Sequence, residues 1–410
     1  MELLNAAAVL ITLAAVFGFI NVRFVHMPTT IGIMMIALLC SVILIIAGQL
    51  GLADLREQAS RLLQTIDFHE TLMQGMLSFL LFAGALHVDL SDLAKQKWVI
   101  LILATFGVIT STVIVGSLSW IVLDVLGLGI PFIYALLFGA LISPTDPIAV
   151  MGILKQAGVS KSLETKIAGE SLFNDGVGVV VFLVLLGIAT SGQTPTASSI
   201  GMLFLKEALG GIVFGLVTGG IAFWMLRQVN NYQIEVLITL SLVMGGYALA
   251  TQLHLSGPIA MVVAGLLIGN HGRIFAMSDS TREHLDTFWE LLDEIFNAVL
   301  FVLMGLEIMI LTLQHEYLLA ALVIIPLVLF ARFVSIGLPI VLLSYIREFS
   351  PRVVEIMTWG GLRGGISIAL ALSLPLGAER DIILAITYAV VVFSIFVQGL
   401  TIGKLTSSQR

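Results

Sequence analysis

The chain has 410 residues, of which 59% are hydrophobic and only 11% carry a charge. A soluble globular domain has a charged fraction of about 25%, so this composition excludes that class and indicates a polytopic helical membrane protein in a lipid bilayer. The formal net charge of −7 excludes nucleic acid as a main partner, because its phosphates require a basic surface. The single cysteine, Cys40, excludes an internal disulfide.

A helix needs about 20 mostly apolar residues to span a bilayer, and this length divides the chain into thirteen segments within one membrane domain, 1–410. The segments run 3–20, 28–50, 71–88, 98–123, 131–154, 163–189, 200–226, 233–252, 257–269, 291–312, 317–344, 353–374 and 381–403. The start of the chain lacks the positive charge of a cleavable signal, so the first segment is expected to remain a span. An alternative count of twelve merges or loses one span at the N-terminus.

Lys and Arg side chains are distributed unevenly between alternate loops. One set of loops and the C-terminus holds thirteen of them, the other set holds four, and the last two, Arg332 and Arg363, lie inside apolar segments. Because positive loops stay in the cytoplasm, this bias predicts a multi-pass protein of the cytoplasmic (inner) membrane with its N-terminus outside and its C-terminus inside.

Six ionisable side chains lie inside the predicted spans, where each costs at least about 2.5 to 3.5 kcal/mol on insertion scales. They are Asp146, Glu170, Asp175, Glu307, Arg332 and Arg363. Four carboxylates against two guanidinium groups leave an excess of negative charge that a dry interior will not hold. A carboxylate must therefore take up a proton or a cation, which predicts coupled cation and proton transport.

The fifth span contains Ser143-Pro144-Thr145-Asp146-Pro147. Its two prolines remove backbone donors and clash with preceding carbonyls, so the helix is expected to break here. A break in a membrane helix is tolerated where it lines a cavity, and its freed backbone groups can then bind ions. We therefore predict that Thr145 and Asp146 contribute to an ion site.

The sixth span carries Ser171 and Asp175 four residues apart on one strip, with Glu170 and Asn174 on the adjoining strip. Asp175 lies nine residues from Lys166, and Asp146 lies nine residues from Lys155, at the same predicted side of the membrane. Both aspartates should therefore sit at a depth of about 13 Å, which allows them to meet.

The segment Asp279 to Asp293 has the pattern of an amphipathic cytoplasmic helix leading into the tenth span, or of a solvated connector. Glu290, Asp293 and Glu294 at its end either raise the local cation concentration or form a solvated helix end. Glu307 and Arg332 fall at similar depths on neighbouring antiparallel spans, which would allow an ion pair between them.

The twelfth span contains Gly360-Gly361-Leu362-Arg363-Gly364-Gly365, and four glycines around one charge predict a second interrupted helix. The fifth and twelfth spans are an odd number of spans apart and so run in opposite directions. Two interrupted helices in opposite directions are typical of an inverted-topology repeat with its ion site at the membrane midplane. Arg363 is then either a fixed cation that balances an acid or a gate, and balancing is favoured since an arginine does not release its proton at working pH.

At these motifs the chain resembles the monovalent cation:proton antiporter-1 family, which holds the prokaryotic NhaP antiporters and the eukaryotic sodium-proton exchangers. The resemblance rests on SPTDPIAVMGILK (143–155), GESLFNDGVGVVVF (169–182), LSGPIAMVVAGLLIGN (255–270), FWELLDEIFNAVLFVLMGLE (288–307) and WGGLRGGISIALAL (359–372). It implies a thirteen-helix homodimer of the antiporter fold, with a core, roughly 98–189 and 317–403, that moves as an elevator against a dimerisation unit.

The resemblance also implies roles for single residues. Asp175 would be the shared site of the cation and the proton, assisted by Asp146, the Thr145 main chain and Ser171. Glu170 would pair with either Arg363 or Arg332 beside Asn174. Many relatives carry an acidic residue in the third span, whereas this chain has Ala83, which offers no ligand.

The sequence therefore predicts exchange of a monovalent cation, Na⁺ and also Li⁺, for H⁺, without a cofactor and with a role in pH homeostasis. Asn174 in place of a second aspartate favours an electroneutral exchange of one cation for one proton. A K⁺/H⁺ antiporter is the main alternative. A channel is disfavoured because no symmetric filter-like repeat occurs, and an embedded enzyme because no hydrolase or metalloprotease motif occurs.

Overall fold

The computed structural model describes residues 2–50, 68–146, 151, 154, 159–191, 197–309, 311 and 314–407, and these residues form helices without any strand. The predicted all-helical fold class is confirmed. The α-helices are α1 (Glu2–Ile20), α2 (Thr29–Gln49), α4 (Phe68–Glu70), α5 (Leu77–Leu86), α6 (Leu90–Ile102), α7 (Val108–Val125), α8 (Phe132–Ile142), α10 (Lys161–Ser191), α11 (Ala197–Gln228), α12 (Tyr232–Gln252), α13 (Gly257–Leu267), α14 (Arg273–Phe275), α15 (Asp279–Leu306), α16 (His315–Ser344), α17 (Val353–Trp359), α18 (Gly365–Leu372), α19 (Ala378–Phe393) and α20 (Gly399–Ser407).

Short π-helical segments join several of these helices into longer rods. The joining segments are Thr71–Met76, Leu103–Gly107, Ile268–Gly272 and Ser394–Gln398, whereas Asn21–Val25 only extends α1. A 3₁₀ turn, Glu307–Met309, follows α15. Eight helices in the described ranges are long and apolar enough to cross a membrane, and each coincides with a predicted span. The N-terminal pair α1 and α2 are separate spans, so the alternative that merges or loses one there is not supported.

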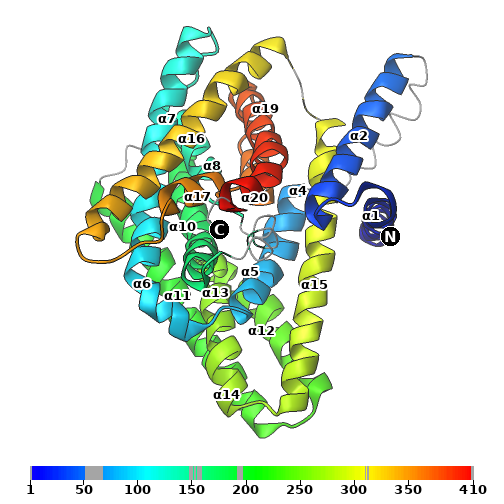
Figure 1. Cartoon of the computed structure of the whole chain (residues 1–410), viewed down its shortest axis with the longest axis vertical. Coiled ribbons are helices and arrows are strands. Elements are labelled where there is room, and N and C mark those ends of the chain that lie inside the picture. Colours follow the sequence, from blue (N-terminus) through cyan, green and yellow to red (C-terminus); the bar gives the residue numbers. More distant parts are fainter. Residues whose placement is uncertain are drawn as a thin grey trace.

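The helices pack in two groups (Figure 1). In one group α8 packs against α7 and α10, and α16 packs against α7, α17 and α19. In the other group α15 packs against α1, α2, α5 and α12, while α13 packs against α5 and α11. The groups meet where α10 contacts α13 and α5, and where α18 contacts α4 and α15. Polar side chains from both groups are thereby brought to one shared boundary.

The charged segment that precedes the tenth span is helical from its first residue. The Ser278 hydroxyl caps it by accepting a hydrogen bond from the Thr281 N–H, 3.3 Å away. The helix then continues without interruption from Asp279 to Leu306, so the predicted amphipathic helix and the tenth span are one rod. This continuity explains how a side chain at the end of the charged segment can reach the interior.

The contact between α7 and α8 depends on glycine at two facing positions. A Cβ atom on Gly139 would lie 2.3 Å from the Thr112 carbonyl oxygen, and one on Gly116 would lie 2.9 Å from the Leu136 Cα. Backbone atoms cannot move aside as a flexible side chain can. The two helices therefore approach each other more closely than any side chain would permit.

We expect Gly139→Ala to lower the free energy of unfolding by about 1 to 3 kcal/mol, because α7 and α8 must separate to admit the methyl group. Gly187→Ala is the matched control, since no atom lies within 4 Å of its Cβ position on α10. The control should match or exceed the wild-type stability, because alanine favours helix. Thermal unfolding in detergent measures both variants, and equal melting temperatures would contradict the close contact.

Candidate functional site

Both predicted helix breaks are present, and the two extended segments lie against each other. The first follows α8, where residues 143–146 are not helical, and the second, residues 360–364, separates α17 from α18. The Asp146 N–H donates to the Leu362 carbonyl at 2.8 Å. The Arg363 Nη1 donates to the carbonyls of Ser143 at 2.6 Å and Pro144 at 3.0 Å. Each break thus satisfies backbone groups that the other leaves without helical partners.

Glycine permits the closest approach at this crossing. A Cβ atom on Gly364 would lie 2.5 Å from the Asp146 Oδ2 and 2.7 Å from its Cβ. Any larger residue would displace the Asp146 side chain. The Arg363 N–H donates to the Ser394 hydroxyl at 2.9 Å, which ties the second break to the helix that follows α19. The glycine-rich sequence around Arg363 is therefore explained by both its break and its packing.

The polar strips of α10 meet the first break. The Asn174 amide nitrogen donates to the Thr145 hydroxyl at 2.8 Å and to Glu170 Oε1 at 2.7 Å, and its Oδ1 accepts from the Thr145 N–H at 3.2 Å. The hydroxyls of Thr145 and Ser171 lie 2.9 Å apart. All four side chains are buried. This network fixes the break relative to α10 on the side next to Asp175.

Glu170 is paired with Arg332, which answers the question the sequence left open between Arg332 and Arg363. Both carboxylate oxygens of Glu170 accept from the guanidinium group of Arg332, each at 2.7 Å. The alternative ion pair between Arg332 and Glu307 is not present among the described residues. Arg363 also does not balance an acid directly within the described residues, because its guanidinium donates to the two carbonyls at the first break.

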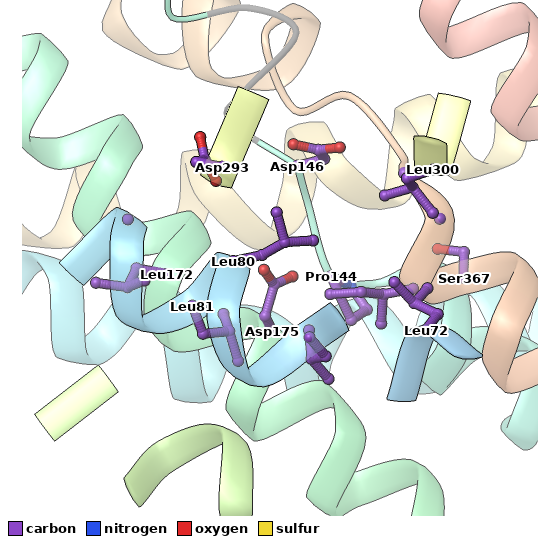
Figure 2. A pocket seen from close by; sticks show the side chains of 15 residues that line it. Leu72, Leu80, Leu81, Pro144, Asp146, Leu172, Asp175, Asp293, Leu300 and Ser367 are labelled. Atoms are coloured by element: carbon purple, nitrogen blue, oxygen red, sulfur yellow. The ribbon is translucent and has the colours of Figure 1, made fainter. Parts of the chain in front are cut away.

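A cavity of about 100 Å³ lies beside this crossing (Figure 2). Three carboxylates line it: Asp146 from the first break, Asp175 from α10 and Asp293 from α15. Most of the remaining wall is apolar and comes from the π-helical segment Thr71–Met76 and from α5, α10 and α15, with Leu72, Leu80, Leu81, Leu172 and Leu300. Asp146 and Asp175, which the sequence predicted to come together, therefore line the same cavity.

Asp175 is 7% exposed, and the described part of the chain offers it no hydrogen-bond or ion-pair partner. Neither arginine near the crossing lines this cavity, since Arg332 is bound to Glu170 and Arg363 to carbonyls. A buried carboxylate without a counter-charge must bind a proton or a cation. The cavity can therefore bind a small cation or release one in exchange for a proton.

The four predicted ligands occupy different positions around the cavity. Asp146 and Asp175 line it, whereas the Thr145 and Ser171 hydroxyls are bound to each other beside it. Ala83 does not line it: its neighbour Gly84 does, and Ala83 packs among the buried side chains that surround Trp289. The sequence placed Asp293 only at the mouth of the tenth span. Asp293 lies seven residues before Leu300, which puts both side chains on one face of the helix. This spacing is the sequence signal that could have identified Asp293 as a cavity residue.

Known proteins resemble this chain along nearly its whole length. The family model described as "Sodium/hydrogen exchanger, transmembrane" matches residues 9–407. The Na(+)/H(+) antiporter NhaP of Pseudomonas aeruginosa is 52% identical over 407 residues, covering 98% of this chain and 96% of that protein. The Na(+)/H(+) antiporter NhaH of Halobacillus aidingensis is 37% identical, covering 88% of this chain and 90% of that protein.

A solved structure has the same fold. The sodium proton antiporter MjNhaP1 from Methanocaldococcus jannaschii matches with a TM-score of 0.75 over 99% of both chains, at 20% sequence identity. The predicted antiporter fold is confirmed by this match. With the family model covering almost the whole chain, the protein is a multi-pass membrane protein that belongs to the sodium/hydrogen exchanger family, whose members are secondary transporters and not enzymes.

Proposed function

We propose that the protein exchanges Na⁺ for H⁺ across the cytoplasmic membrane, with the two ions competing for Asp175. The observation that carries this proposal is a carboxylate, 7% exposed, that faces a mostly apolar cavity without a counter-charge in the described residues. The relatives named as Na(+)/H(+) antiporters support it. If Asp175 holds one ion at a time, alternating exposure of the cavity to the two sides produces exchange.

The surrounding residues have two kinds of proposed role. Asp146 adds a second carboxylate to the cavity, and Thr145 and Ser171 contribute oxygen atoms that become ligands if their mutual hydrogen bond opens. Glu170, Asn174, Arg332 and Arg363 are proposed to hold the two breaks in register with α10. Their hydrogen bonds to one another and to the carbonyls of the first break support this structural role.

The proposed movement is an elevator motion of a core formed by residues 98–189 and 317–403. Both breaks and Asp175 belong to this core, whereas Asp293 belongs to the other group of helices. A vertical shift of the core would carry Asp175 past fixed side chains of the scaffold. We further propose a homodimer formed through that scaffold, with the N-terminus outside and the C-terminus in the cytoplasm.

We expect the exchange to be electroneutral, because Asn174 is uncharged and is bonded to Glu170 and Thr145, so that of the neighbouring pair Asn174 and Asp175 only Asp175 can exchange its charge. The measurement is proton flux through the purified protein in liposomes that contain a pH dye. An inside-negative or inside-positive membrane potential is imposed. The flux driven by Na⁺ should not depend on the potential. A flux that follows or generates the potential would contradict one-for-one exchange.

The same liposomes test the proposed function itself. Na⁺ and Li⁺ added outside should each drive proton movement, while liposomes without protein give the background. Proton movement driven by K⁺ but not by Na⁺ would establish the alternative K⁺/H⁺ antiporter. Single-channel currents in place of saturable exchange would overturn the transporter mechanism.

A further inference from the structure

The third carboxylate of the cavity, Asp293, comes from a different part of the fold than the other two. Asp146 and Asp175 belong to the helices around the crossing, whereas Asp293 lies on α15, which packs mainly against α1, α2, α5 and α12. Asp293 faces the cavity together with Leu300 of the same helix. In the view of Figure 2, Asp293 and Asp146 lie on one side of Leu80, and Asp175 lies on the other.

Asp146 is the charged neighbour that the other two carboxylates share. Asp146 interacts electrostatically with both Asp175 and Asp293. Nevertheless, no three acidic, His or Cys side chains of the described residues converge closely enough to hold one ion together. The three carboxylates therefore suit two successive cation positions that share Asp146 better than one common position.

A neighbouring amide adds an oxygen on the Asp293 side. Asn297, one turn further along α15, interacts with the Asp293 side chain through its own side chain. It is 3% exposed, and its Oδ1 has no hydrogen-bond partner among the residues that the structure describes. A buried amide oxygen is a good ligand for Na⁺, and an unsatisfied one costs free energy until it finds a partner.

We propose that Asp293 and Asp146 form a first cation position that is occupied before the cation reaches Asp175. We call it the outer position because the cation reaches it before Asp175, whichever side of the membrane it faces. This inference rests on the proposed antiport at Asp175 and adds a residue of the scaffold to the ion path. A carboxylate there raises the local concentration of cations beside a mostly apolar cavity. This carboxylate also offers the cation replacement ligands while the cation loses its water, before the cation passes Leu80 on its way to Asp175.

Asp293→Asn should raise the Na⁺ concentration for half-maximal exchange about tenfold, equivalent to about 1.4 kcal/mol, with the maximal rate preserved. Asp293→Glu should restore most of the affinity because it keeps the charge. Glu283→Gln, an exposed site on the same helix outside the cavity, should leave the half-maximal concentration unchanged. The proposal would be overturned if Asp293→Asn lowered both the maximal rate and the stability of the protein, or if all three variants had the same half-maximal Na⁺ concentration.

A binding measurement separates this proposal from the antiport itself. Line broadening of ²³Na⁺ in nuclear magnetic resonance reports occupied sites on detergent-purified protein without any transport. With Asp175→Asn, part of the broadening should remain, and adding Asp293→Asn should remove it. If the variants change the line broadening as described but the wild type exchanges no ions, the outer position is supported and the proposed antiport is wrong. If Asp175→Asn alone removes all broadening, the outer position is wrong.

Discussion

Asp175→Asn should reduce cation-driven proton flux to the background of empty liposomes while the protein remains folded. Asparagine keeps the size of the side chain but neither binds a proton nor carries the charge that attracts a cation. Within the described residues the Asp175 carboxylate has no partner whose hydrogen bond would be lost. The free energy of unfolding should therefore stay the same or rise, because a buried charge without compensation has been removed.

The matched control is Asp124→Asn, which makes the same substitution at an exposed position on the last turn of α7. It should exchange ions at the wild-type rate. Size-exclusion elution and thermal unfolding of both variants establish that they are folded. If Asp175→Asn keeps a substantial rate, the exchanging carboxylate must be another one, and Asp146 would be the next candidate because it lines the same cavity.

The sequence predicted the architecture around the cavity because the relevant signals are local. The prolines that flank Thr145 and Asp146 predict the break after α8, and the glycines around Arg363 predict the break between α17 and α18, whatever the rest of the chain does. Counting residues from flanking lysines then gave the depth of Asp146 and Asp175, because the rise of a helix is constant. The resulting prediction that they meet needed no knowledge of side-chain packing.

The partner of Glu170 and the place of Asp293 could not be predicted in this way. Two arginines lie inside apolar segments, and only the tertiary placement of α16 decides that Arg332 is the one that reaches Glu170. Asp293 ends a charged stretch that reads as a solvated or interfacial helix. Its access to the cavity arises because α15 continues as one straight rod and packs against α5 and α18.

The second large effect is expected for Glu170→Ala, which should lower the free energy of unfolding by about 3 to 5 kcal/mol. Glu170 is 1% exposed, and its loss leaves the guanidinium of Arg332 buried without its counter-charge. It also removes an acceptor of Asn174, which positions the first break. Thermal or denaturant unfolding in detergent measures this loss, and the half-maximal Na⁺ concentration of the remaining folded protein should change much less.

A double substitution distinguishes the cost of the orphaned charge from the value of the pair. Replacing both residues, Glu170→Met with Arg332→Met, should recover much of the stability, because two apolar side chains of similar size leave no charge without a partner. Arg332 also packs against Gly361, because a Cβ atom on Gly361 would lie 2.6 Å from the Arg332 Nε. The double variant therefore also tests whether the Arg332 guanidinium supports the second break.

The comparison of stability with affinity then decides the role of the pair. A double variant that is stable and still exchanges Na⁺ would show that the ion pair acts through the fold alone. A double variant that is stable but inactive would mean that the two side chains hold the breaks in a geometry that apolar packing cannot reproduce. If Glu170→Ala were as stable as the wild type but bound Na⁺ poorly, Glu170 would belong to the ion site, and its pairing with Arg332 would be a feature of one transport state.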